Sequence, residues 1–118
     1  MKEGSKVVGS LKGLKPKYKF WLESDDGYVF GHGSFDLLQG IQEKGSLSGS
    51  ARATGMSYRY AWGIIKQIEK RVGTPILETH KGGKRGGGAK LTSTGRELLE
   101  TYQKYKTALD QICEALRP

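Results

Sequence analysis

Three adjacent residues, Ser57, Tyr58 and Arg59, open a segment whose spacing is that of an amphipathic helix over 58–72. Its apolar residues recur on one face: Ala61, Ile64, Ile65 and Ile68. Ser57 can cap this helix, which leaves Arg59 in the first turn on the opposite face. A guanidinium there can donate two hydrogen bonds to O6 and N7 of a guanine, a contact that contributes about 1–3 kcal/mol of base discrimination. The segment therefore predicts a helix that can read base edges.

The same face carries other side chains that suit contacts with a DNA duplex. Besides capping the helix, Ser57 can reach a phosphate, Tyr58 can bond a phosphate or lie against sugar and base edges, and Lys66 suits the phosphate backbone. For Trp62 two interpretations stand: half-buried packing against the preceding helix, which we favour, and contact in the groove. We keep Trp62 among the candidate DNA-contact residues. Tyr60 lies between the two faces and is given no role.

A second basic cluster lies in the glycine-rich segment 80–90. Five glycines among residues 82–88 separate a short strand at 76–79 from a return strand at 89–91, so a long hairpin tip is expected. With few Cβ atoms, this tip can approach a duplex closely. Its cations can meet phosphates or enter the minor groove: Lys81, Lys84, Arg85 and Lys90. We interpret the tip as a DNA-binding wing, and the alternative is a surface loop without a role.

The elements before the long helix complete a helix-turn-helix. Ser34 can cap a helix over about 35–44 that stops at Gly45, and Ser48 can cap a short helix that ends at Gly55. Two helices joined by a turn of about three residues that contains glycine are typical of this motif. Its second helix lies in the major groove with its N-terminal residues nearest the bases.

The N-terminal part is expected to contribute a tail and a hairpin. Residues 1–13 mix Gly, Ser and Lys without periodicity and are predicted to be a disordered tail. Residues 14–118 are predicted to form one domain, opening with a β-hairpin over about 18–30 that turns at Asp25-Asp26-Gly27. The expected fold class is α+β: a winged helix-turn-helix with an N-terminal β-hairpin and a long C-terminal helix.

The last helix, capped by Thr92 or Thr94, has a heptad seam. Apolar residues recur at alternating steps of four and three: Leu98, Tyr102, Tyr105, Leu109, Ile112 and Leu116. The seam either packs along the domain or pairs with a second copy. Because the first three helices already close a core, we expect it to form a dimer.

Charge is unevenly distributed along the 118 residues, whose formal net charge is +8. Residues 1–20 carry +5 and residues 56–91 carry +6, whereas residues 21–55 carry −3 and residues 92–118 are neutral. Two basic segments that flank a mildly acidic one favour a polyanionic partner, because phosphates attract clustered cations.

Other function classes find little support. The two histidines lie in glycine-rich loops and no serine, histidine and acid grouping stands out, so no enzyme is expected. Cys113 is the single cysteine, and its spacing from His32 and His80 resembles no metal site, so no disulfide, metal or cofactor is expected. The start lacks a signal peptide and no apolar run spans a bilayer, so we expect a soluble, cytoplasmic protein without a membrane partner.

Four stretches together form a pattern narrower than a generic helix-turn-helix. They are Leu14-Lys15-Pro16, Gly45-Ser46-Leu47, the run from Ala51 to Arg59 followed by Ala61-Trp62, and the wing end from Gly86 to Thr92. With these motifs, the chain from about Lys15 to Tyr105 resembles the N-terminal DNA-binding domain of the ModE family of molybdate-responsive regulators, which is related to the LysR-type winged helix.

The resemblance implies a homodimer held by the terminal helices, with help from the N-terminal hairpin, on a palindromic operator. It also implies DNA contacts for Ser57, Tyr58, Arg59 and the basic wing. Family members carry a C-terminal oxyanion-binding region, and this chain ends at Pro118 without one. We therefore expect a stand-alone DNA-binding member, or a chain whose sensor is missing, that does not bind molybdate.

The predicted function is that of a homodimeric transcriptional regulator that binds double-stranded DNA sequence-specifically. The alternative is a protein-interaction module that uses the C-terminal helix and the wing and has incidental DNA affinity.

Overall fold

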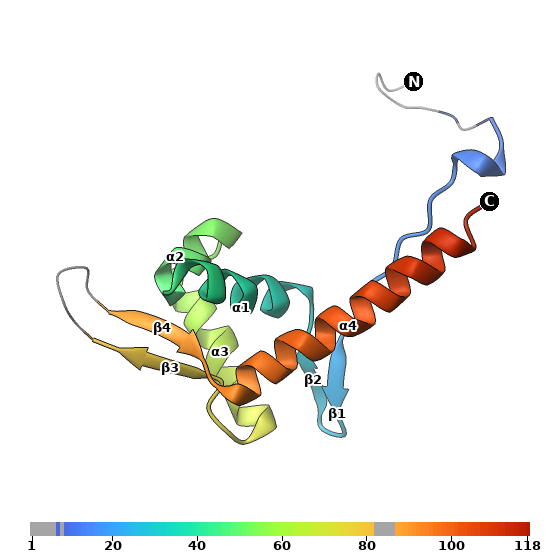
Figure 1. The fold of residues 1–118 in the computed structure, drawn as a ribbon. Coiled ribbons are helices and arrows are strands. Elements are labelled where there is room, and N and C mark those ends of the chain that lie inside the picture. The colour runs from blue at the N-terminus through green and yellow to red at the C-terminus, as the bar shows by residue number, and fades with distance from the viewer. Residues whose placement is uncertain (1–6, 8, 82–86) are drawn as a thin grey trace.

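The computed structural model describes residues 7, 9–81 and 87–118 and shows an α+β fold, as predicted (Figure 1). After a 3-10 turn at Leu11–Gly13, the elements are β1 (Leu22–Ser24), β2 (Gly27–Phe30), α1 (His32–Lys44), α2 (Leu47–Thr54), α3 (Tyr58–Val72), β3 (Leu77–His80), β4 (Gly88–Leu91) and α4 (Ser93–Ala115). Among the described residues, no helix has the length and apolar content needed to cross a membrane.

The core lies where α1 and α3 meet the two hairpins. Its large side chains with essentially no exposed surface are Phe30, Leu37, Leu38, Ile41, Ile65, Ile68 and Ile76. Each such side chain contributes about 1.5–3 kcal/mol by leaving water. Since these residues come from β2, α1, α3 and the approach to β3, burial fixes the position of α3 relative to both hairpins.

Close packing of α1 on α2 sets the first half of the helix-turn-helix. The Ser50 hydroxyl donates a 2.6 Å hydrogen bond to the Leu37 carbonyl, although both lie inside helices. A Cβ at Gly40 would overlap the Ser50 hydroxyl and come within 2.9 Å of the Ser50 Cβ. Glycine at position 40 therefore lets the two helices approach closely at this point.

The turn between α2 and α3 has the predicted length. Gly55 adopts the left-handed conformation with φ +76°, which ends α2 at a position where a residue with a Cβ would be strained. The Met56 N–H then donates to the Ala51 carbonyl at 2.8 Å, and Ser57 caps α3. The predicted bounds of α3 and the predicted glycine stops at Gly45 and Gly55 are confirmed.

Two predicted helix caps are wrong. Ser34 does not cap α1: the helix begins at His32 after Gly31, and Ser34 is buried within it. A glycine cap has no side chain that would mark it in the sequence. Ser48 does not cap α2 either, because the helix already begins at Leu47, which is buried, and Ser48 lies inside it. The cap is Ser46, whose Oγ accepts a 2.9 Å hydrogen bond from the Gly49 N–H.

The N-terminal hairpin is shorter than predicted. β1 pairs antiparallel with β2 around a turn at Asp25 and Asp26, with Gly27 at φ +121°. Residues 18–21 do not join this hairpin. They run beside α4, where the Phe20 ring stacks on Tyr102 with centroids 4.3 Å apart. The alternation of aromatic residues before β1 therefore serves a helix contact and not a strand pair.

The predicted tail is covered only in part. Leu11–Gly13 forms a 3-10 turn whose side chains are exposed, and residues 1–6 and 8 lie outside the described residues. The assignment of residues 1–13 as a disordered tail stays a prediction.

The wing hairpin and the long helix leave the helical body in opposite directions (Figure 1). β3 pairs with β4 in the register Leu77 with Leu91, and the two predicted strands are found with bounds that differ by one residue. Thr92 caps α4 by accepting a hydrogen bond from the Gly95 N–H at 3.2 Å, so Thr92 and not Thr94 is the cap. The C-terminal part of α4 extends beyond the body together with the N-terminal segment.

Candidate nucleic-acid interface

The first turn of α3 is fixed by its cap and open to solvent. Ser57 Oγ accepts a 3.1 Å hydrogen bond from the Tyr60 N–H. The remaining N–H groups of the first turn give this end of the helix a partial positive charge, which favours anions. Ser57, Tyr58, Arg59 and Tyr60 are all exposed. Anionic groups of a ligand can therefore approach this turn directly.

The two faces of α3 are those that the periodicity predicts. Ala61, Ile65 and Ile68 are buried and Ile64 is half-buried. The opposite face is exposed at its central positions, which are Arg59, Gly63, Lys66, Gln67 and Lys70. The helix thus presents three cations in a row pointing away from the core.

A stacked ladder borders this exposed row. The rings of Tyr58 and Trp62, one helical turn apart, are parallel within 6° and have centroids 6.4 Å apart. The Lys66 ammonium lies 4.6 Å from the centroid of Trp62, a cation–π contact. Trp62 is half-buried, as favoured from the sequence, and packs against the core, while its ring also lies between Tyr58 and Lys66.

Glu69 connects this ladder to the wing. Its Oε1 lies 3.3 Å from the Lys66 ammonium, and its Oε2 accepts a 2.9 Å hydrogen bond from the Ile76 N–H just before β3. Lys66 is therefore positioned and partly neutralised within the chain. Arg59 and Lys70, in contrast, have no ion pair within residues 7, 9–81 and 87–118.

The base of the wing is attached to α1. The Ala89 N–H donates a 2.9 Å hydrogen bond to the carbonyl of Gly45, the residue that ends α1. Lys81 is exposed at the end of β3, and Lys90 on β4 lies 3.7 Å from Glu78 across the hairpin in a solvent-exposed pair. Lys84 and Arg85, the other two predicted wing contacts, lie outside the described residues.

Comparison with known proteins agrees with this geometry. A family model described as the bacterial regulatory helix-turn-helix protein of the lysR family matches residues 33–96, which is more than half of the chain. The chain belongs to this family. The matched region runs from α1 through the wing to the start of α4.

Several curated relatives confirm the resemblance to ModE regulators. The chain is 31% identical over 99 residues to the molybdenum transport protein ModE of Azotobacter vinelandii, covering 80% of this chain and 37% of that protein. It is 39% identical over 66 residues to the DNA-binding transcriptional dual regulator ModE of Escherichia coli K12, covering 56% of this chain and 25% of that protein.

The molybdenum-pterin-binding protein MopB of Rhodobacter capsulatus is likewise 39% identical over 66 residues, covering 56% of this chain and 24% of that protein. The chain thus spans from about a quarter to a little over a third of the length of these relatives.

Two exposed residues of this lysR-family motif were missed from the sequence. Tyr60, in the first turn of α3, has 63% of its surface exposed and stands beside Arg59. Arg52 is exposed in the last turn of α2, where it precedes the turn into α3. Helical projection puts Tyr60 at the boundary between the buried and exposed faces, so the spacing alone did not reveal its exposure. No signal in the sequence singled out Arg52.

The heptad seam of α4 divides into two parts. Tyr102 is buried and Leu98 packs against the core, so the start of the seam belongs to the domain itself. Leu109 is half-buried, and beyond the body the same face becomes open: Tyr105 is exposed, Ile112 has 53% of its surface exposed and Leu116 has 78%. Packing along the domain, one of the two alternatives considered for the seam, therefore holds for its start, and pairing with a second copy stays a prediction for its exposed end.

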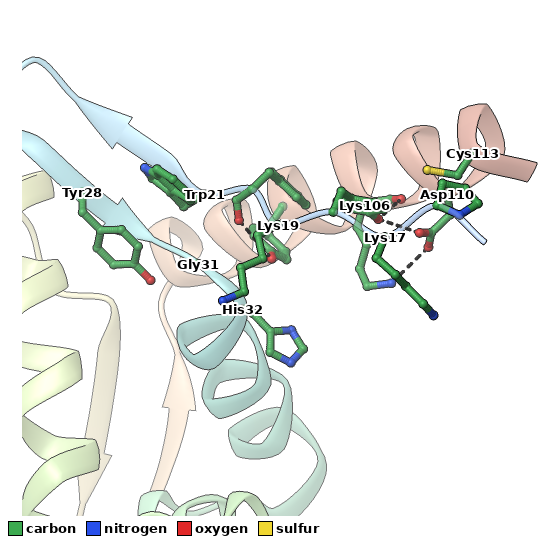
Figure 2. Close-up of a pocket in the computed structure, with 13 residues that line it drawn as sticks. Lys17, Lys19, Trp21, Tyr28, Gly31, His32, Lys106, Asp110 and Cys113 are labelled. Atoms are coloured by element: carbon green, nitrogen blue, oxygen red, sulfur yellow. Dashed lines mark hydrogen bonds and ion pairs between the residues drawn. The ribbon is translucent and has the colours of Figure 1, made fainter. Parts of the chain in front are cut away.

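A pocket of about 610 Å³ lies between the N-terminal segment and α4 (Figure 2). Trp21 and Tyr28 line one end of it, and Lys106, Asp110 and Cys113 line the other. The Tyr18 hydroxyl donates a 2.5 Å hydrogen bond to Asp110 Oδ1, and the Lys106 ammonium donates to Oδ2 at 3.0 Å. These contacts fasten the segment before β1 to the protruding part of α4.

The contact between Tyr18 and Asp110 changes the acidity of both groups. The hydrogen bond to Asp110, with a smaller contribution from burial, raises the pKa of Tyr18 to about 12. The hydrogen bonds from Tyr18 and then from Lys106 lower the pKa of Asp110. Burial raises the pKa of Tyr102. The phenol of Tyr18 thus stays protonated, and able to donate to Asp110, well above the ordinary tyrosine pKa.

Proposed function

We propose that this chain is a transcriptional regulator that binds double-stranded DNA, with α3 in the major groove and the wing on the flanking backbone. The observation that carries the proposal is the capped first turn of α3, the second helix of the motif. This turn carries three exposed residues, Tyr58, Arg59 and Tyr60. Arg59 reads a guanine, whereas Ser57, Tyr58 and Lys66 position the helix on phosphate and sugar groups.

We further propose that the functional unit is a homodimer joined through the exposed part of the α4 seam. A two-fold pair of such domains places its recognition helices in successive major grooves, about 34 Å apart, on a palindromic site. An unpartnered apolar stripe is a common mark of a protein interface. The exposed residues Ile112 and Leu116 supply such a stripe on each chain.

Binding to duplex DNA at several salt concentrations tests the proposal. The probe is a duplex enriched by the wild-type chain from a random-sequence library, and a scrambled duplex of the same length is the reference. We expect the enriched duplex to survive competitor DNA and log K to fall steeply with log salt, because cations release counterions from phosphates. A salt-independent affinity, or equal affinity for both duplexes, contradicts the proposal.

Two variants separate base reading from backbone contact. Arg59→Ala should reduce the preference for the enriched duplex by about 1–3 kcal/mol. Lys84→Ala with Arg85→Ala should weaken both duplexes alike and lower the salt slope by about two, since each lost phosphate contact lowers it by about one. Lys104→Ala on α4 removes one exposed charge away from the motif and serves as the control. If the two sets of variants act alike, the assigned roles are wrong.

A protein-interaction module is the second candidate, and the exposed end of α4 is the observation that favours it. Sedimentation distinguishes the two. A dimer at micromolar concentration that binds the enriched duplex supports the regulator, whereas a stable monomer with the stripe exposed supports a module that awaits another protein.

Molybdate is not expected to bind this chain, although the names of two relatives refer to molybdenum. Isothermal titration of the chain with sodium molybdate tests this expectation, and heat of saturable binding overturns it.

A further inference from the structure

Gly63 stands in the middle of α3, and neither its backbone conformation nor a neighbour among the described residues requires glycine there. Glycine is a poor helix former and weakens a helix interior relative to alanine. Its usual justifications are a positive φ or a neighbour that leaves no room for a Cβ. Gly63 has neither, because its φ is not positive and a Cβ built on it meets no atom within 4 Å.

Other glycines show the contrast. Gly45, Gly55 and Gly73 end helices with φ between +75° and +80°. In the helices of the described residues, a Cβ at Gly40 or Gly95 would collide with atoms of a neighbouring element, and one at Gly49 would come within 2.8 Å of a hydroxyl oxygen. Gly33 has a single neighbour, at an ordinary contact distance of 3.9 Å. Among the α-helical glycines of the described residues, Gly63 is the one beside which a Cβ would meet empty space.

The position of that empty space is specific. Gly63 is exposed and follows Arg59 by one helical turn, with Lys66 and Lys70 next along the same face. The Tyr58–Trp62–Lys66 ladder lies along one side of it. A side chain at position 63 would therefore project from the middle of the surface that carries the recognition residues.

We propose that Gly63 is a close-approach position, at which the missing side chain lets the backbone of α3 come near the floor of the major groove. This inference rests on the proposed DNA-binding function and adds the residue that sets the depth of the helix. A helix seated deeper brings the first turn, with Arg59, within hydrogen-bonding distance of base edges. A larger residue at position 63 holds α3 away from the floor of the groove. The phosphate contacts remain, because they do not require that depth.

Alanine at this position gives two effects of opposite sign. Gly63→Ala should raise Tm by a few degrees, because it improves helix propensity and meets no neighbour. The same variant should bind the library-enriched duplex about tenfold more weakly, the size expected when one base contact is impaired, and bind the scrambled duplex about as well as wild type. Gly63→Leu should weaken specific binding further. Gly33→Ala, which adds the same methyl group to α1, is the matched control and should leave both affinities unchanged.

The arms of the experiment have distinct outcomes. If the wild-type chain shows no preference for the enriched duplex, the DNA-binding function and the role of Gly63 are both overturned. If wild type shows the preference and Gly63→Ala and Gly63→Leu keep it within twofold, the role of Gly63 alone is overturned. A lower Tm for Gly63→Ala also overturns it, because the glycine would then serve the fold.

Discussion

Removal of the two apolar side chains at the free end of α4 should separate the proposed dimer. Full burial of a leucine or isoleucine contributes about 1.5–3 kcal/mol. Ile112 and Leu116 have 53% and 78% of their surface still exposed. Dimerisation can therefore bury, on each chain, the equivalent of a little more than one whole side chain of this size. For two chains, Ile112→Ala with Leu116→Ala should cost about 4–8 kcal/mol of dimerisation free energy, which raises the dimer Kd by about a thousandfold or more.

Sedimentation equilibrium across a dilution series measures this Kd, and circular dichroism checks that each chain remains folded. Because both side chains are exposed within the single chain, we expect the helical signal of the isolated domain to persist. Thr107→Ala with Gln111→Ala removes exposed side chains from the same protruding helix, away from the seam, and should leave the Kd unchanged. An unchanged Kd in the seam variant, or a wild-type chain that is monomeric at tens of micromolar, refutes the reasoning.

Three further predictions concern the fold around the interface. Ser46→Ala should lower the free energy of unfolding by about 1 kcal/mol through loss of the α2 cap, whereas Ser48→Ala should change it little; equal effects in urea denaturation would contradict the observed cap. Gly40→Ala should destabilise the protein by about 1–3 kcal/mol, because its methyl group would overlap the Ser50 hydroxyl, and a higher Tm would show that α1 and α2 can separate at no cost. In an absorbance titration of tyrosinate, Asp110→Asn should move one phenol from a pKa of about 12 toward the ordinary value of 10.0; an unaltered curve would mean that Tyr18 is not held by Asp110.

The last of these predictions has a consequence for stability at alkaline pH. The pKa of Tyr18 is raised on folding, so its contribution to stability is complete below pH 10 and is lost as the pH rises toward 12. The pKa of Asp110 is lowered on folding, so its contribution is present at neutral pH and is lost in acid. The docking of the N-terminal segment on α4 should therefore be firmest between these limits.

Local signals explain what the sequence could predict. The bounds of α3 follow from apolar spacing and from Ser57 and Gly73 at its ends, and left-handed glycines mark the ends of α1 and α2. These features depend on residues within one or two turns of each other. They also define the exposed face of α3, so most of the candidate site was accessible to sequence reasoning.

Contacts between distant residues explain what could not be predicted. Residues 18–21 alternate like a strand, yet the partners of Tyr18 and Phe20 are Asp110 and Tyr102, more than 80 positions away. The pairing of Lys66 with Glu69 lies within one helical turn, but the bond from the Ile76 N–H that holds Glu69 in place depends on the wing. In the first case, tertiary packing overrides a local strand-like pattern.

The division of the α4 seam relates the fold of one domain to the geometry of the proposed dimer. Tyr102 anchors the helix in the core through stacking on Phe20 and an edge contact with Phe30, and the bond from Tyr18 to Asp110 braces it two turns further on. These contacts set the direction in which the exposed part leaves the body. In a two-fold dimer, that direction also sets the separation of the two α3 helices. A substitution that loosens the brace, such as Asp110→Asn, should therefore weaken binding to a palindromic duplex more than binding to a half-site, although Asp110 lies far from the residues proposed to touch DNA.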